Sequence, residues 1–272
     1  MLEEKYLEAL RKFRLIDDAF FSVCFDDNAK EVEYILRIIL EKDDLQVLKV
    51  QTQKSLENMY GRSVRFDVFA TDTQGKLYNI EVQRTDAGAI PQRARYNSVM
   101  LDYHELQKRG EFKELPESFV IFITENDVIG DGEKIYHADR IIRETGKDFN
   151  DGTHIIYVNG SFKGEEGKSL DDLIHDFFCA NPQEMRHKQL ANRVKFLKEN
   201  RGEVDKMSNS IIAEIFKDEL AEAKEKTAEE TKQKTLIENI RSMMKKLNLT
   251  AQQAMDILEV PEDEQEKYMA LI

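Results

Sequence analysis

The chain of 272 residues has no tryptophan, only two cysteines and four prolines, and no long uninterrupted apolar run. Two cysteines, Cys24 and Cys179, are too few for a disulfide framework or a thiolate zinc site, and their aromatic neighbours indicate buried free thiols. The lack of an apolar run predicts no membrane-spanning helix. Residues 1–13 are too charged to be typical of a signal peptide. We therefore expect a cytoplasmic protein with no membrane partner.

Positive charge is also scarce, because 40 Lys and Arg residues stand against 53 Asp and Glu residues, giving a net charge of −13. This balance opposes general attraction to phosphate backbones and argues against a strong nonspecific nucleic-acid binder. Residues 84–95 and 185–201 are local exceptions in which basic side chains predominate. The second cluster suits a solvated helix face as well as a nucleic-acid-binding patch. The absence of tryptophan makes a glycosidase, which works with a pair of carboxylates, an unlikely alternative.

The most informative stretch is residues 64–84, where two segments of alternating apolar and polar residues flank a short polar turn. Alternation with a period of two is typical of a strand with one buried face. The three-residue loop Thr73-Gln74-Gly75 favours a hairpin whose glycine takes a left-handed conformation. The register imposed by this turn places Asp67 directly opposite Glu81.

Asp67 and Glu81 are predicted to lie on the same face, with Cβ atoms roughly 4.5 to 5.5 Å apart. Two carboxylates at that distance repel each other, and one takes up a proton unless a cation lies between them. Mg²⁺ prefers such hard oxygen ligands. The alternative without a function is that both acids point to solvent, but their apolar neighbours predict central strands. We therefore predict that both acids bind the metal of a phosphodiester-cleaving centre.

Asp67 followed by Glu81-Val82-Gln83 resembles the D…ExQ form of the PD-(D/E)xK nuclease signature. This form is found in the recombination-promoting nuclease (Rpn) group of PD-(D/E)XK transposase-like proteins. Three further stretches resemble the group in the expected order: the D-x-x-F-x-x-x-F pattern of residues 18–25, the arginine- and tyrosine-containing residues 91–96, and the strand-like residues 115–123. The resemblance covers roughly residues 15 to 160.

The resemblance implies an α/β, restriction-endonuclease-like mixed central sheet flanked by helices, and the composition of the C-terminal part adds an all-helical C-terminal extension. It also implies a DNA endonuclease that uses Mg²⁺ or Mn²⁺. Asp67, Glu81 and the Val82 carbonyl would hold the metal, and Gln83 would orient the attacking water. The superfamily usually has lysine at the position of Gln83, and an amide cannot supply lysine's positive charge. A nuclease-shaped protein that no longer cleaves and acts as a binding scaffold is therefore the alternative.

Three side chains are predicted to contact the substrate. Arg65 lies opposite Gln83 in the predicted register and could supply the missing charge. Pro91 suits the first turn of a helix that ends near Arg109, and this helix would place Gln92 and Arg93 near the carboxylates. Arg93 is then a candidate phosphate clamp, and its structural alternative is an ion pair with a nearby acid. The apolar face of this helix is predicted to contain Tyr96, Val99, Met100, Tyr103 and Leu106.

The acids of the N-terminal helices are harder to assign. Asp17 or Asp18 is predicted to cap the helix that follows, and a second metal-site acid is the alternative for Asp18. Asn28 is predicted to cap a helix that runs to about Lys42. Glu31 and Glu33 flank its apolar stripe, and in related nucleases a glutamate of the first core helix can reach the metal. The sequence does not distinguish between these two.

The composition changes after Pro182, which predicts a nuclease-like domain over residues 1–182 and a helical extension over residues 183–272. Long helices are expected from about Leu190 to Leu247, with an apolar stripe around residues 211–220. Thr250 and Gln253 form a capping-box pattern. We expect the extension to end in a small two-helix module that serves packing or homodimer formation, with DNA recognition by a helix-turn-helix as the alternative.

Overall fold

The computed structural model describes residues 8–58, 61–199, 235–247 and 249–258, together with residues 260, 265, 268 and 269. The chain divides into two compact units, residues 1–212 and 213–272, and each is described by itself.

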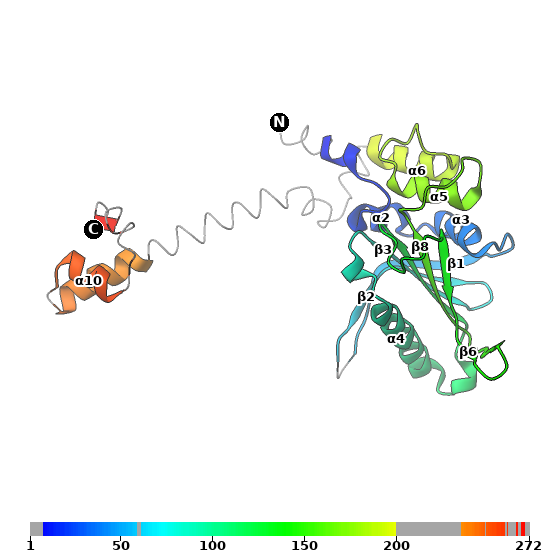
Figure 1. Ribbon diagram of the computed structural model, residues 1–272, viewed down its shortest axis with the longest axis horizontal. Coiled ribbons are helices and arrows are strands. Elements are labelled where there is room, and N and C mark those ends of the chain that lie inside the picture. The colour runs from blue at the N-terminus through cyan, green and yellow to red at the C-terminus, as the bar shows by residue number, and fades with distance from the viewer. Residues whose placement is uncertain are drawn as a thin grey trace. The chain divides into compact units, whose positions relative to one another are not determined.

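A mixed six-stranded sheet forms the centre of the first unit (Figure 1). Its spatial order is β1-β2-β3-β4-β8-β5. The strands β1, β2 and β3 are antiparallel neighbours, β3, β4 and β8 are parallel, and β5 is antiparallel to β8. Their bounds are β1 Val47–Leu56, β2 Val64–Asp72, β3 Leu77–Gln83, β4 Ser118–Thr124, β5 Ile135–Ala138 and β8 Thr153–Asn159. The strands β6 (Ile141–Ile142) and β7 (Lys147–Asp148) form a separate small ribbon. The predicted mixed sheet is confirmed, with β2, β3 and β4 in its interior.

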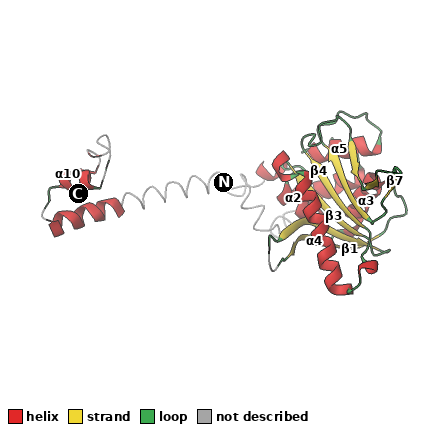
Figure 2. Ribbon diagram, turned by 60° about the horizontal axis from the view of Figure 1, so that its bottom comes forward, coloured by secondary structure: helices red, strands yellow, loops and turns green. Residues whose placement is uncertain are grey.

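Helices cover the sheet. Their bounds are α2 Asp18–Phe25, α3 Ala29–Leu40, α4 Pro91–Arg109, α5 Ser169–Phe178 and α6 Lys188–Glu199. Figure 2 shows α4 lying across the strands, and α4 contacts β4 and β8. Helix α2 contacts β1, β2 and β3, while α3 contacts β1 and α5. One apolar core forms where α4 meets the sheet, and its members include Phe69, Ala94, Met100, Val120, Phe122 and Tyr157.

The hairpin turn between β2 and β3 has the predicted form. Gly75 has a φ of +83°, and its N–H donates to the Asp72 carbonyl at 3.1 Å. The Asp72 carboxylate accepts the N–H groups of Gln74 and Lys76, which fixes the loop. The paired residues run from Thr71 with Leu77 to Val68 with Ile80, so the predicted register is confirmed.

Helix α4 begins at Pro91 and ends at Arg109, near the predicted end, and Gly110 with a φ of +85° is its C-cap. Its predicted apolar face is wrong in part, because Val99 is 51% exposed and Tyr103 is 37% exposed. The face turned to the sheet instead includes the buried polar residues Asn97 and Ser98. Those polar positions interrupt the apolar pattern from which the face was inferred, and Asn97 is occupied in a hydrogen bond to β3.

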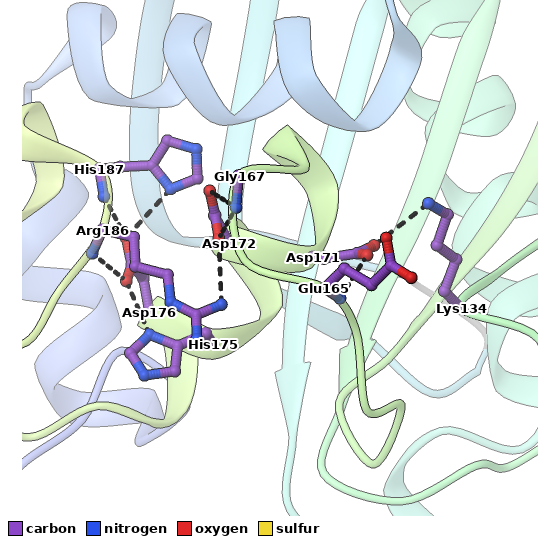
Figure 3. Close-up of polar contacts among 9 residues, drawn as sticks. All are labelled: Lys134, Glu165, Gly167, Asp171, Asp172, His175, Asp176, Arg186 and His187. Atoms are coloured by element: carbon purple, nitrogen blue, oxygen red, sulfur yellow. Dashed lines mark hydrogen bonds and ion pairs between the residues drawn. The ribbon is translucent and has the colours of Figure 1, made fainter.

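Helix α6 is fixed to the core at its N-terminus by Asp176 of α5 (Figure 3). The Asp176 carboxylate is fully buried and accepts the backbone N–H groups of Arg186 and His187 at 2.7 and 2.8 Å. The same carboxylate contacts the Nδ1 atoms of His175 and His187. These contacts lower the pKa of Asp176, with the His187 side chain as the leading favourable contributor against the cost of burial. One carboxylate therefore fixes the backbone of the two residues that precede α6.

Two basic residues of α6 are also used structurally. The Lys198 ammonium donates to the carbonyl oxygens of Arg11, Phe13 and Ala180. Arg193 donates to the carbonyl oxygens of Cys24 and Val23. Within residues 185–199, Arg193 and Lys198 therefore serve the packing of α6 on the first unit. Lys188 and Lys195 of the same cluster are exposed, and nucleic-acid binding by them stays a prediction. Of the two thiols, Cys24 is buried as predicted, whereas Cys179 is only half-buried.

The second unit contains a helix at residues 235–247 and α10 (Ala251–Ile257). Thr250 and Gln253 form the predicted capping box. Ile240, Ala254, Met255, Val260 and Tyr268 pack into a small core. The predicted apolar stripe of residues 211–220 lies outside the described residues. No described helix is long and apolar enough to cross a membrane.

Candidate active site

Asp67 of β2 and Glu81 of β3 lie where the two strands stop pairing through their backbones. The last backbone pair is Val68 with Ile80, one residue before the two acids. The Val82 N–H then donates to Asp67 Oδ2 at 3.0 Å, so a side chain bridges the next step between the strands. Asp67 is 5% exposed and Glu81 is 0% exposed. The predicted juxtaposition of the two carboxylates therefore agrees with the register and occurs inside the protein.

Burial gives both acids an unusual proton affinity. Desolvation raises the pKa of Asp67 well above its ordinary value, and the negative charges of Glu81 and Asp18 raise it further. The pKa of Glu81 is raised to about 6, again chiefly by desolvation, although Asn79 and Arg93 act in the opposite direction. Buried, mutually repelling carboxylates are stabilised by a nearby cation, which is the electrostatic setting of a metal centre.

A chain of amides holds Glu81 in place. Asn79 Nδ2 donates to Glu81 Oε1 at 2.7 Å, and Asn97 Nδ2 of α4 donates to Asn79 Oδ1 at 3.1 Å. All three residues are buried. Sequence reasoning missed both asparagines. The available signal was a polar residue two positions before Glu81 in an otherwise apolar strand, which places it on the same face.

Arg93 reaches the carboxylates from the first turn of α4. Its Nη2 donates to Glu81 Oε2 at 2.9 Å, and its Nη1 donates to the Gly88 carbonyl at 2.8 Å and to Gln83 Oε1 at 3.4 Å. The ion pair with a nearby acid, which was the structural alternative for Arg93, is thus present, and its partner is Glu81 itself. A guanidinium therefore stands beside the position where the signature usually has lysine.

Gly88 also shapes the surroundings of Gln83. A Cβ atom at Gly88 would lie 2.0 Å from Gln83 Oε1. Any larger residue here would force the Gln83 amide to move. The sequence suggested only a flexible turn at this point.

The other two predicted substrate contacts lie at the surface. Arg65 and Gln92 are both exposed, and Arg65 of β2 pairs with Ser55 of the edge strand β1. Gln92 is therefore not on the buried face of α4. Their roles in substrate binding stay predictions, and of the three basic or amide side chains only Arg93 has contacts to Glu81 and Gln83.

Among the N-terminal acids, Asp18 is the one whose negative charge raises the pKa values of both Asp67 and Glu81. Of the two predicted caps, Asp17 occupies the N-cap position of α2, and Asp18 is the first residue of the helix. Glu33 is bonded to the Val47 N–H and to Arg37. Burial raises the pKa of the Cys24 thiol, and the negative charge of Glu31 adds to that rise.

The donor set fits a hard divalent cation. Within the described parts of the chain, no three His, Cys, Asp or Glu side chains are grouped to bind one metal. Two carboxylates suffice for Mg²⁺, which commonly keeps several waters. The N–H and C=O of a strand residue point to the same neighbouring strand. Since the Val82 N–H meets Asp67, the Val82 carbonyl faces the same gap and offers a third oxygen.

A cleft of about 730 Å³ begins one strand away from this site. Its wall includes Glu125, whose N–H donates to the Gln83 carbonyl at 2.9 Å, and loop residues that follow β8. Asp67 and Glu81 do not line it. The cleft therefore adjoins the carboxylates without containing them.

The sequence family described as PD-(D/E)XK nuclease family transposase matches residues 32–245. The chain belongs to this family. The mixed sheet flanked by helices is accordingly a restriction-endonuclease-like α/β fold. Asp67 lies on β2, and Glu81, Val82 and Gln83 lie on β3. PD-(D/E)XK nucleases generally use divalent metal ions.

No curated protein and no solved structure matches the chain. The family assignment and the geometry of β2, β3 and α4 therefore carry the functional argument.

Proposed function

We propose that the protein is a Mg²⁺- or Mn²⁺-dependent DNA endonuclease of the recombination-promoting, Rpn-like type, which hydrolyses phosphodiester bonds. The observation that carries this proposal is the buried Asp67 and Glu81 pair at the end of the β2–β3 ladder, with the Arg93 guanidinium 2.9 Å from Glu81. A buried pair of acids beside one guanidinium, inside a nuclease fold, suits the binding of a divalent cation.

Asp67, Glu81 and the Val82 carbonyl are the groups that would hold the ion. When bound, a divalent ion polarises the scissile phosphate and lowers the pKa of its bound water. The Asn97–Asn79–Glu81 chain keeps the Glu81 carboxylate in one orientation. Partners of this kind, which lie behind the ligands, are generally important for metal affinity.

Gln83 and Arg93 divide the work that one lysine does in the usual signature. The Gln83 amide can orient a water through its donor and acceptor atoms. Arg93 supplies positive charge beside it, and its forked donors suit a phosphate oxygen. Arg93 is bound to Glu81 in the structure, so contact with a phosphate requires it to share or leave that carboxylate.

Plasmid nicking tests the proposal. The variants Asp67→Asn and Glu81→Gln keep the side-chain shapes and should reduce Mg²⁺- or Mn²⁺-dependent nicking by at least 100-fold. Asp131→Asn, in an exposed turn, is the matched control and should nick like the unaltered protein. Unchanged nicking by both site variants would contradict the proposal.

The second candidate is a nuclease-fold protein that no longer cleaves and acts as a binding scaffold. It is favoured by Gln83 in place of lysine and by the net charge of −13. Calorimetry separates the two candidates, because the enzyme should bind Mn²⁺ with loss of binding in Glu81→Gln. A protein that binds neither Mg²⁺ nor Mn²⁺ would favour the scaffold.

We place the protein in the cytoplasm and propose that DNA is its partner. We also propose that residues 183–272 form the predicted helical extension and mediate a homodimer. The small core around Met255 supports the existence of a packed module in this region.

A further inference from the structure

Strand β1 contains an irregularity beside the candidate active site. Gln53 has a φ of +50°, a left-handed conformation that is rare and costly for a residue with a side chain. Its neighbours Thr52 and Lys54 pair with Val68 and Phe66 of β2. Gln53 therefore lies opposite Asp67, and it interrupts the ladder at that point. Strained residues of this kind cluster at functional sites.

The left-handed backbone directs the Gln53 side chain toward α2. Gln53 Nε2 donates to Asp18 Oδ1 at 3.2 Å and to Ser22 Oγ at 2.6 Å. Asp18 and Ser22 are one turn apart on the helix. The amide is thus held by Ser22 at a fixed point and holds Asp18 in turn.

Asp18 is the third negative charge of the site. It is exposed, and its carboxylate is held by Gln53, the residue of β1 that lies opposite Asp67. The same charge would attract a dication bound between Asp67 and Glu81. Because Mg²⁺ keeps several waters when it is held by few carboxylates, an acid beyond direct reach can still accept hydrogen bonds from those waters.

We propose that Gln53 is a positioning residue, which holds the Asp18 carboxylate beside Asp67 and Glu81 as an outer acid of the metal centre. This inference rests on the metal centre of the proposed function. It adds β1 and α2 to a site that the signature confines to β2 and β3. It also explains why a strained glutamine occupies this position of an edge strand. A purely structural tie between α2 and the sheet is the alternative.

Mn²⁺ calorimetry on the full chain distinguishes the two. Gln53→Met removes the donor at nearly constant volume and should weaken Mn²⁺ binding roughly 10-fold, the lower end of the effect expected for such partners. Gln51→Met, on the same strand opposite Phe69, is the matched control and should bind Mn²⁺ normally. Gln53→Met with unaltered Mn²⁺ affinity would overturn the proposal.

A double-mutant cycle shows whether Gln53 acts through Asp18. Asp18→Asn should weaken Mn²⁺ binding, and adding Gln53→Met should then have no further effect, because the carboxylate it positions is gone. Effects that multiply in the double variant would contradict the proposal.

Gln53→Gly separates positioning from stability. Glycine accepts the left-handed backbone without strain, so its Tm should be no lower than that of Gln53→Met, while its Mn²⁺ affinity should fall equally. A structural tie would lower Tm and leave Mn²⁺ affinity intact. If Mn²⁺ binds and responds to Gln53 but plasmid is not nicked, only the proposed enzyme activity fails. If Mn²⁺ does not bind the unaltered protein, the positioning role fails as well.

Discussion

At the scale of single residues, the proposed chemistry depends on Asp67 and Glu81, which are both buried. The hairpin turn fixes which residues of β2 and β3 meet, and turn chemistry is local, so Asp67 and Glu81 could be paired from the printed letters. The contacts of Arg93 with Glu81, Gln83 and Gly88 depend on how α4 packs on the sheet. Packing of that kind joins distant segments, and a single sequence does not contain its geometry.

Asp67→Asn should raise the stability of the protein at neutral pH. The raised pKa of Asp67 means that the folded state keeps its proton to higher pH than the unfolded state. Stability conferred by this group is therefore present in acid and lost as pH rises above the ordinary aspartate value. Asparagine avoids that loss and its oxygen can still accept the Val82 N–H.

The gain in unfolding free energy should be measurable at pH 7.5, and it should shrink toward pH 4, near the ordinary pKa of aspartate. Urea unfolding at the two pH values measures it, with Asp131→Asn as the control. A loss of stability at pH 7.5 would show that the charge of Asp67 is compensated in the metal-free fold.

At the scale of elements, strands and helix bounds followed from periodicity and from Pro91 and Gly110 at the two ends of α4. The sequence did not predict which face of α4 is buried or how α6 is attached to the core. Because Asn97 and Ser98 are polar but buried, the apolar pattern did not predict the buried face of α4. The basic residues of α6 looked like a charged surface, since nothing in their own segment shows that Lys198 meets three carbonyl groups of residues 11, 13 and 180.

Asp176→Asn should loosen α6. Arg186 and His187 donate their N–H groups to different oxygens of the carboxylate, so the NH2 group of an asparagine would face one of these donors. We expect a loss of roughly 2 to 3 kcal/mol at pH 7, as for a buried donor left without its charged partner. Chemical denaturation measures the loss.

Asp172→Asn is the control on the same helix, because Asp172 is less buried and should matter less. The lowered pKa of Asp176 means that its contribution is present above the ordinary aspartate value and disappears as pH falls below it. The difference between Asp176→Asn and the unaltered protein should therefore narrow below about pH 4. A difference that is constant with pH would show that the charge is not the cause.

At the scale of the whole molecule, the sequence indicated a nuclease-like part and a helical part. The division after residue 182 stays a prediction. The contacts of Arg193 and Lys198 place α6 with the first compact unit, residues 1–212. Composition marks where residues become charged, whereas a folding boundary depends on which of them are buried.

A protein ending at residue 212 should therefore fold and bind Mn²⁺ like the full chain, with Tm within a few degrees. A protein ending at residue 182 lacks α6 and should be less stable, because the Asp176 carboxylate loses its donors. Calorimetric melting of both proteins tests this. Sedimentation of the longer of the two against the full chain tests the homodimer, which should be lost with residues 213–272. A dimer that persists would place the interface in the first unit.

The ion pair between Arg93 and Glu81 bears on how the protein exists before it meets a cation. An internal guanidinium already balances the deepest acid of the centre, so the polypeptide has no need of magnesium in order to reach its final shape. A chelator should then abolish the proposed DNA cleavage without unfolding the protein. Added magnesium should restore the cleavage at once, on the time scale of a side chain changing its partner.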